Sequence, residues 1–172
     1  MTAVPKARTR ILGQIRLLLT LFIAGLILSG VTAFPLESEL GLLTRWFHAD
    51  LAAPDGSLRW WIARVNQALA ETGRTHSFLA YGTDWLAFGH IVIALFFIGP
   101  WLDPVRNGWV LKVGLVACAG VVPLAMICGS IRGVPLYWRL IDCSFGIFGA
   151  IPLLICLKLA ARLRDPAPAE AR

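Results

Sequence analysis

Four apolar stretches, each long enough to cross a lipid bilayer, constrain this sequence more than any other feature. They run over about 11–33, 83–102, 109–129 and 136–160, and a spanning helix needs about 20 predominantly apolar residues. Hydrophobic residues make up 58% of the chain and charged residues 15%, too apolar a balance for a soluble domain of this length. The sequence therefore predicts an all-α membrane protein, a four-transmembrane-helix bundle that forms one domain over 1–165.

Basic residues beside these stretches indicate the orientation. They precede the first stretch, flank the connection between the second and third, and follow the fourth: Lys6, Arg8, Arg10, Arg16, Arg106, Lys112, Lys158, Arg162 and Arg164. The positive-inside rule assigns these regions to the cytoplasm. We therefore expect a multi-pass protein of a bacterial cytoplasmic membrane, with both termini cytoplasmic and a loop at 34–82 outside. The net charge of +6 indicates topology and contact with membrane lipid, and no nucleic-acid binding is expected.

The outer loop carries a pattern typical of an amphipathic helix. Ser57 is a plausible N-cap and Gly73 a plausible helix stop. Apolar residues repeat between them at helical spacing: Leu58, Trp61, Ile62, Val65 and Leu69. Tryptophans near the start suit the headgroup zone, so we expect an extracytoplasmic helix at the membrane interface. A shorter helix over 36–47 is expected before it, and the tail at 166–172 is expected to be disordered.

Small residues predict which helix faces meet, because close approach lets van der Waals contacts accumulate between helices in lipid. The predicted faces are Gly25, Ser29 and Thr32 on the first span, Thr83, Ala87, His90 and Ala94 on the second, Gly114, Cys118, Val121, Ala125 and Cys128 on the third, and Arg139, Asp142, Gly146, Gly149 and Leu153 on the fourth. The cysteines form no CxxC pair and are expected to be small apolar residues.

Ionisable side chains gather toward the outer end of the predicted bundle. At about 1.5 Å per residue, Asp142 lies roughly 9 Å deep and His90 roughly 12 Å deep. An ionisable group at such depth costs at least a few kcal/mol unless it is paired or hydrated. We therefore expect an outward-facing polar pocket, without a metal, formed by Glu37, Glu39, Tyr81, Asp84, His90, Arg132, Tyr137, Arg139 and Asp142.

Structural alternatives stand beside these assignments. Arg139 and Asp142, three residues apart, could neutralise each other as an ion pair. His90 could be a neutral interhelical hydrogen-bond donor and no metal or haem ligand. Glu37 and Glu39 could be first-turn acids of the loop helix. Two further histidines, at 48 and 76, are expected to be solvated.

One stretch resembles a known family. Arg139-Leu-Ile-Asp142-Cys-Ser-Phe-Gly146-Ile-Phe-Gly149-Ala is similar to the last-helix pattern of the VanZ-like family of small bacterial membrane proteins. Asp84 and His90 resemble that family's Asp and His pair, although no Lys follows Asp84. The resemblance implies an envelope location, linked to glycopeptide resistance, and no defined reaction. The segments at 32–40 and 81–90 are also similar to a group of uncharacterised bacterial integral membrane proteins.

Familiar catalytic motifs are missing, including a G-x-S-x-G elbow, HExxH, a P-loop and a Gly-rich dinucleotide turn. A non-enzymatic role is therefore favoured, and catalysis is left open. The leading hypothesis is an envelope protein whose polar pocket binds a lipid or other amphiphile, with Arg132 and Arg139 meeting an anionic headgroup. The alternatives are a redox protein in which His90 binds haem or contacts a quinone, and a structural subunit of a homo-oligomer or larger membrane complex.

Overall fold

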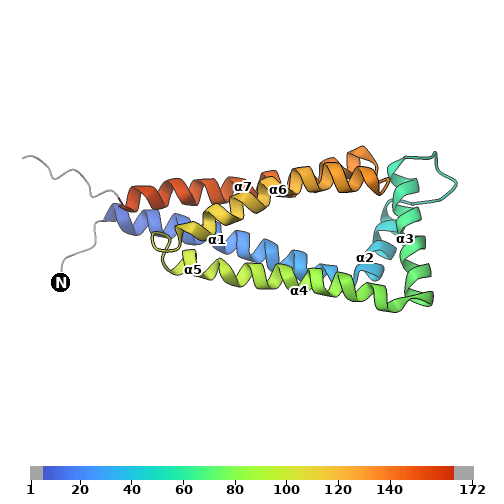
Figure 1. Cartoon of the computed structure of the whole chain (residues 1–172), viewed down its shortest axis with the longest axis horizontal. Helices are drawn as coiled ribbons and strands as arrows, with labels where there is room; N and C mark the ends of the chain where they lie inside the picture. Colours follow the sequence, from blue (N-terminus) through green and yellow to red (C-terminus); the bar gives the residue numbers. More distant parts are fainter. Residues whose placement is uncertain (1–5, 165–172) are drawn as a thin grey trace, which may run out of the picture. The chain divides into compact units, whose positions relative to one another are not determined.

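The computed structural model describes residues 6–164 and is helical throughout its regular elements. The elements are α1 (Lys6–Ala33), α2 (Leu36–Trp46), α3 (Leu58–Thr75), the 3-10 helix η1 (Ser77–Ala80), α4 (Tyr81–Phe96), α5 (Ile98–Leu102), α6 (Gly108–Ile131) and α7 (Leu136–Arg164), as labelled in Figure 1. Segments long and apolar enough to cross a membrane are Lys6–Ala33, Ser77–Leu102, Gly108–Ile131 and Leu136–Arg164. The predicted all-α class with four such helices is confirmed, and the tail predicted at 166–172 lies outside the described residues.

Two compact units make up the described chain. Residues 6–25 and 94–164 belong to the first unit, and Leu26–Ile93 form the second. The boundaries fall inside α1 and α4, so each of these helices contributes to both units. A single domain over 1–165 remains a prediction.

Within the first unit, α6 and α7 pack along each other (Figure 1). Glycine makes this possible, because a Cβ built on Gly146 would lie 2.5 Å from the carbonyl oxygen of Cys118. A Cβ on Gly114 would lie 2.9 Å from Cδ1 of Leu153. The predicted faces of the third and fourth spans therefore do meet, by the close approach that small residues allow. Side chains with no exposed surface around this seam are Ile15, Leu19, Leu111, Leu153 and Cys156.

The second unit joins the C-terminal part of α1 to α4 through a different glycine from the one predicted. A Cβ on Gly30 would lie 2.8 Å from the carbonyl oxygen of Ala87 and 3.1 Å from Cβ of His90. The predicted face of α4 is therefore confirmed. The predicted face of α1 is wrong, because a Cβ on Gly25 would meet nothing within 4 Å. A helix in lipid can carry apolar side chains on every face, so the small residues at helical spacing on α1 did not identify the face that packs against α4.

The loop helices α2 and α3 follow the sequence prediction closely. The Ser57 hydroxyl oxygen accepts a hydrogen bond from the Trp60 amide at 3.2 Å, which confirms the predicted N-cap. Arg59 donates from Nε and Nη2 to the His48 carbonyl oxygen at 2.9 and 2.6 Å, and so ties the end of α2 to the start of α3. The predicted stop at Gly73 is wrong, because α3 continues to Thr75.

A break separates α4 from α5. The last residue of α4 is Phe96, four positions before Pro100. Proline has no amide hydrogen to donate to the carbonyl four residues earlier, and its ring clashes with that carbonyl. The sequence therefore ends α4 at this point.

Candidate binding site

The nine residues of the predicted pocket are divided between the two units. The second unit holds Glu37, Glu39, Tyr81, Asp84 and His90, and the first holds Arg132, Tyr137, Arg139 and Asp142. A pocket that contains all nine remains a prediction. Each unit nevertheless has polar geometry of its own.

A hollow of about 190 Å³ lies among the loop helices and the start of α4, and we call it the polar hollow. Its lining combines two carboxylates, an imidazole and two hydroxyl groups with apolar side chains: Phe34, Leu36, Glu37, Leu69, Thr72, Gly73, His76, Leu79, Ala80, Thr83 and Asp84. These residues come from α2, α3, η1 and α4 and from the connections before α2 and before η1. The fold therefore brings Glu37 and Asp84, both predicted site residues, to one hollow.

Gly73 lines this hollow and does not end α3. Its φ is not positive, since Gly56 and Gly133 are the positive-φ glycines within residues 6–164. A Cβ built on Gly73 would lie 3.4 Å from Oε2 of Glu37. A methyl group at this position would therefore make ordinary van der Waals contact with the carboxylate.

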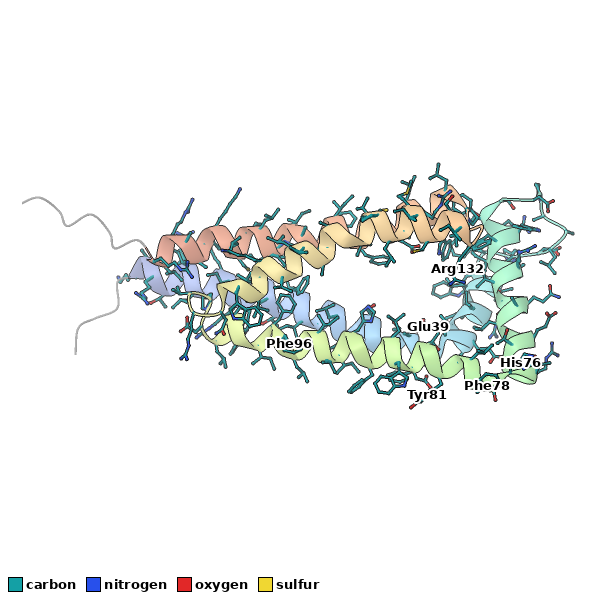
Figure 2. All side chains as sticks on the ribbon, in the orientation of Figure 1. Glu39, His76, Phe78, Tyr81, Phe96 and Arg132 are labelled. Carbon is teal, nitrogen blue, oxygen red and sulfur yellow. The ribbon has the colours of Figure 1, made fainter. Side chains whose placement is uncertain are left out.

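A second hollow adjoins the first along α4, and we call it the aromatic groove. It has a volume of about 270 Å³ and is lined by Phe34, Tyr81, Asp84, Trp85 and Phe88. The Trp85 ring stands edge-to-face with both neighbours on the helix, at centroid distances of 6.0 Å to Tyr81 and 5.9 Å to Phe88. Figure 2 labels Tyr81 on α4, with Phe78 and His76 following it around the corner toward α3. Phe34 and Asp84 line both hollows.

The two hollows are acidic. Among the described residues, neither lining contains lysine or arginine. Two other acids serve local structure: Asp50 accepts from the Ala52 amide and Asp103 from the amides of Val105 and Arg106.

Glu37 and Asp84 differ from these acids. Within residues 6–164, no hydrogen bond of the chain reaches the side chain of either. Both carboxylates are therefore free to accept hydrogen bonds from a ligand or from water.

The remaining candidates of the second unit line neither hollow. His90 places Nδ1 2.8 Å from the carbonyl oxygen of Leu86, one turn earlier on α4. The predicted interhelical hydrogen bond is thus replaced by one within the helix, while Cβ of His90 lies close to Gly30 of α1. Glu39 lies on α2, in its first turn, as its structural alternative requires.

His76 was missed by the sequence analysis, which expected it to be solvated. It is exposed, and it also lines the polar hollow. Its position one residue before η1, where the chain turns from α3 into α4, is the signal that could have identified it. Residues at such a corner face the helices on both sides of the turn.

In the first unit, Arg139 lies against the end of α6. Its Cδ and Cγ would be 2.7 and 2.8 Å from a Cβ on Gly129, and Nη1 donates to the Met126 carbonyl oxygen at 3.4 Å. Within the described chain, no hydrogen bond joins Arg139 to Asp142, so the predicted pairing is not formed. The Nε of Arg139 and the hydroxyl of Tyr137 are buried without a partner in the part of the chain described. Arg132 is exposed at the C-cap of α6 (Figure 2).

No group of three or more His, Cys, Asp or Glu side chains that could hold a metal ion occurs within residues 6–164. The chain matches no protein-family model, no curated protein and no solved structure. Its function is therefore inferred from the two hollows and the residues that line them.

Proposed function

We propose that this chain is a protein of the bacterial cytoplasmic membrane that binds an amphiphile at the N-terminal end of α4. The four long apolar helices support the membrane location. Basic residues in the N-terminal part of α1 and the C-terminal part of α7 favour cytoplasmic termini, which would put the polar hollow on the outer side of the membrane.

The observation that carries the proposal is that the polar hollow and the aromatic groove adjoin. They share Phe34 and Asp84. The polar hollow adds a second carboxylate, an imidazole and two hydroxyl groups to its apolar lining, whereas the aromatic groove adds three aromatic rings. Small-molecule sites in proteins are largely apolar, with a few polar groups that fix orientation. An amphiphile, which has a polar head and an apolar tail, matches this pair better than a wholly polar solute does.

In this proposal α3 forms a wall of the site. Leu69, Thr72 and Gly73 of α3 line the polar hollow, and Ile62 and Ala63 on the same helix are buried. The guanidinium of Arg64 lies 5.0 Å from the centroid of the Trp60 ring, an arrangement suited to the membrane interface. The helix would thus lie along the membrane surface and cover the head of the bound amphiphile.

The proposal assigns binding and no reaction. It does not require the anionic headgroup expected at Arg132 and Arg139, and that contact remains a prediction. A VanZ-like relationship, too, remains a prediction.

The test is mass spectrometry of the intact full-length protein purified in mild detergent. It compares the wild type with a variant in which a larger side chain fills the polar hollow. Ala80→Phe introduces a large ring at a residue that lines the polar hollow. The matched control is Ala68→Phe, at an exposed position of α3 that lines neither hollow. We expect a retained lipid mass in the wild type and in Ala68→Phe and its loss in Ala80→Phe. Equal retention in both variants would contradict the proposal.

A redox function is the second candidate, and one observation favours it. Because Nδ1 of His90 lies 2.8 Å from the Leu86 carbonyl oxygen, the hydrogen-bonded tautomer leaves Nε2 free to bind haem iron or a quinone oxygen. The absorption spectrum of the purified protein separates the two candidates. A Soret band that is lost in His90→Ala would replace amphiphile binding with haem binding as the function.

A further inference from the structure

We infer that the head of the bound amphiphile carries an ammonium group, held between the Asp84 carboxylate and the aromatic rings of the groove. The inference rests on the proposed function and deepens it, because it names the chemistry of the head. It depends on three features of the second unit: the charge of the linings, the identity of the rings, and the position of Asp84 in both hollows.

Charge disfavours an anionic head at this position. Asp84 and Glu37 line the polar hollow, and no lysine or arginine of the described residues joins them. A phosphate or carboxylate placed there would meet two like charges with no lysine or arginine to offset them, which is unfavourable. A group with positive charge would instead be attracted by both carboxylates.

The aromatic rings indicate that the cation is an organic one and not a metal ion. Tyr81 and Phe88 stand at positions −3 and +4 from Asp84, which makes them its neighbours along α4. Trp85 packs against both of these rings and lines the same groove. An ammonium group over the face of such rings is attracted by their quadrupoles, most strongly by tryptophan, and quaternary ammonium ligands are recognised in this way. Metal ions prefer several oxygen or nitrogen ligands, and no such group of three occurs in the part of the chain described.

The surroundings of the groove indicate that the cation belongs to an amphiphile and not to a free solute. The rings are more than half exposed, with values of 62% for Tyr81, 58% for Trp85 and 51% for Phe88. They lie on a segment apolar enough to span a membrane, Ser77–Leu102. A tail that leaves the head at Asp84 can therefore follow the rings directly into the lipid.

Both features have structural alternatives. Aromatic residues are common at membrane interfaces, and an acid in the first turn of a helix is favoured by the helix dipole. Neither alternative requires that Asp84 select one lipid head over another. Lipid selectivity is therefore the property to measure.

The experiment presents the full-length protein in detergent with an equimolar mixture of three lipids that share the same acyl chains. These are phosphatidylcholine with a quaternary ammonium, phosphatidylethanolamine with a primary ammonium, and phosphatidylglycerol with none. Mass spectrometry of the intact complexes measures how much of each lipid stays bound to the protein. We expect the two ammonium lipids together to exceed phosphatidylglycerol by about tenfold, the size of one charge-assisted contact with a cation–π contribution.

Variants then show which side chains cause the selectivity among the three lipids. Asp84→Asn keeps the shape of the side chain and should bring the three lipids close to equal retention, whereas Asp55→Asn, in an exposed turn outside both linings, should change nothing. Trp85→Leu keeps an apolar side chain but removes the ring and should reduce the preference for phosphatidylcholine most. Trp109→Leu, an exposed ring on α6, is its control.

The outcomes separate the inference from the proposed function. Retention of phosphatidylglycerol at or above the ammonium lipids would overturn the ammonium head and leave amphiphile binding in place. Selectivity that survives Asp84→Asn would also overturn it. Retention of no lipid by the wild type would overturn the proposed function itself.

Discussion

Two regions of this protein use polar side chains in opposite ways: the helix ends and connections of the first unit, and the polar hollow of the second. In the first unit, long polar side chains donate to backbone carbonyls left free by helix ends and connections. Arg164 donates to Val105 at 2.8 Å and Asn107 to Gly99 at 3.0 Å, while Trp101 donates to the Thr20 hydroxyl at 3.0 Å. In the second unit, Glu37 and Asp84 line a hollow and accept no hydrogen bond from the described chain.

This difference distinguishes polar side chains that stabilise the fold from polar side chains that are available to bind a ligand. A polar group in an apolar surrounding costs free energy unless it is hydrogen-bonded, so the bonds of the first unit are what its helices need in lipid. Replacing an acid that accepts no such hydrogen bond should therefore cost the protein less stability. We therefore expect seam residues to control folding and the acids of the hollow to control binding.

The largest effect on stability is expected at the α6–α7 seam. In Gly146→Ala the added methyl would lie 2.5 Å from the Cys118 carbonyl oxygen, so the helices must separate, at a cost of about 1–3 kcal/mol. Thermal unfolding in detergent measures this cost. Gly120→Ala on α6, where a Cβ would meet nothing within 4 Å, is the control. Equal stability of the two variants would mean that the seam does not hold the first unit together.

A somewhat smaller effect is expected where α1 meets α4. Gly30→Ala would place a methyl 2.8 Å from the Ala87 carbonyl oxygen, and we expect a loss of about 1–2 kcal/mol in the same unfolding assay. Gly25→Ala, on the same helix and free of neighbours within 4 Å, should lose none. If Gly25→Ala is the more damaging change, the packing of the second unit described above is wrong.

Loss of a helix cap should reduce the stability of the protein less than either glycine substitution does. Ser57→Ala removes the acceptor for the Trp60 amide and should weaken the start of α3 by about 1 kcal/mol. Hydrogen exchange of the first-turn amides of α3 should rise accordingly. Ser38→Ala, at an exposed position on α2, provides the comparison and should leave these amides unchanged.

The smallest effect on stability is expected at the acids. Glu37→Gln should change the free energy of unfolding by less than about 0.5 kcal/mol, since no hydrogen bond within the described residues depends on it. It should nevertheless lower lipid retention, while Glu39→Gln, outside both linings, should not. A large loss of stability in Glu37→Gln would show that this acid is structural and would remove the contrast between the units.

Features set by local chemistry could be predicted from the sequence. The four long apolar helices follow from runs of apolar residues, and the start of α3 follows from Ser57, whose side chain caps its own helix. The end of α3 could not be predicted in this way. Gly73 resembles a helix stop, yet its φ is not positive and the helix continues to Thr75.

Contacts between distant segments were predictable only where one face carried a distinctive pattern. On α7 the glycines at 146 and 149 mark one face, and that face does pack against α6. On α1 several small residues lie on different faces, and lipid accepts the apolar side chains between them, so Gly30 could not be distinguished from Gly25. The polar hollow was predicted in part, through Glu37 and Asp84, whereas His76 enters it only because η1 turns the chain there.

The most direct test of amphiphile binding is to map where a bound lipid lies. The full-length protein would be reconstituted with a phosphatidylcholine that carries a photoactivatable diazirine near the start of one acyl chain, irradiated and digested. We predict adducts concentrated in the peptide that contains Tyr81, Trp85 and Phe88 and at Phe34, with a marked decrease in Asp84→Asn. Adducts spread evenly over the exposed faces of α6 and α7, or unchanged in Asp84→Asn, would contradict a binding site at the N-terminal end of α4.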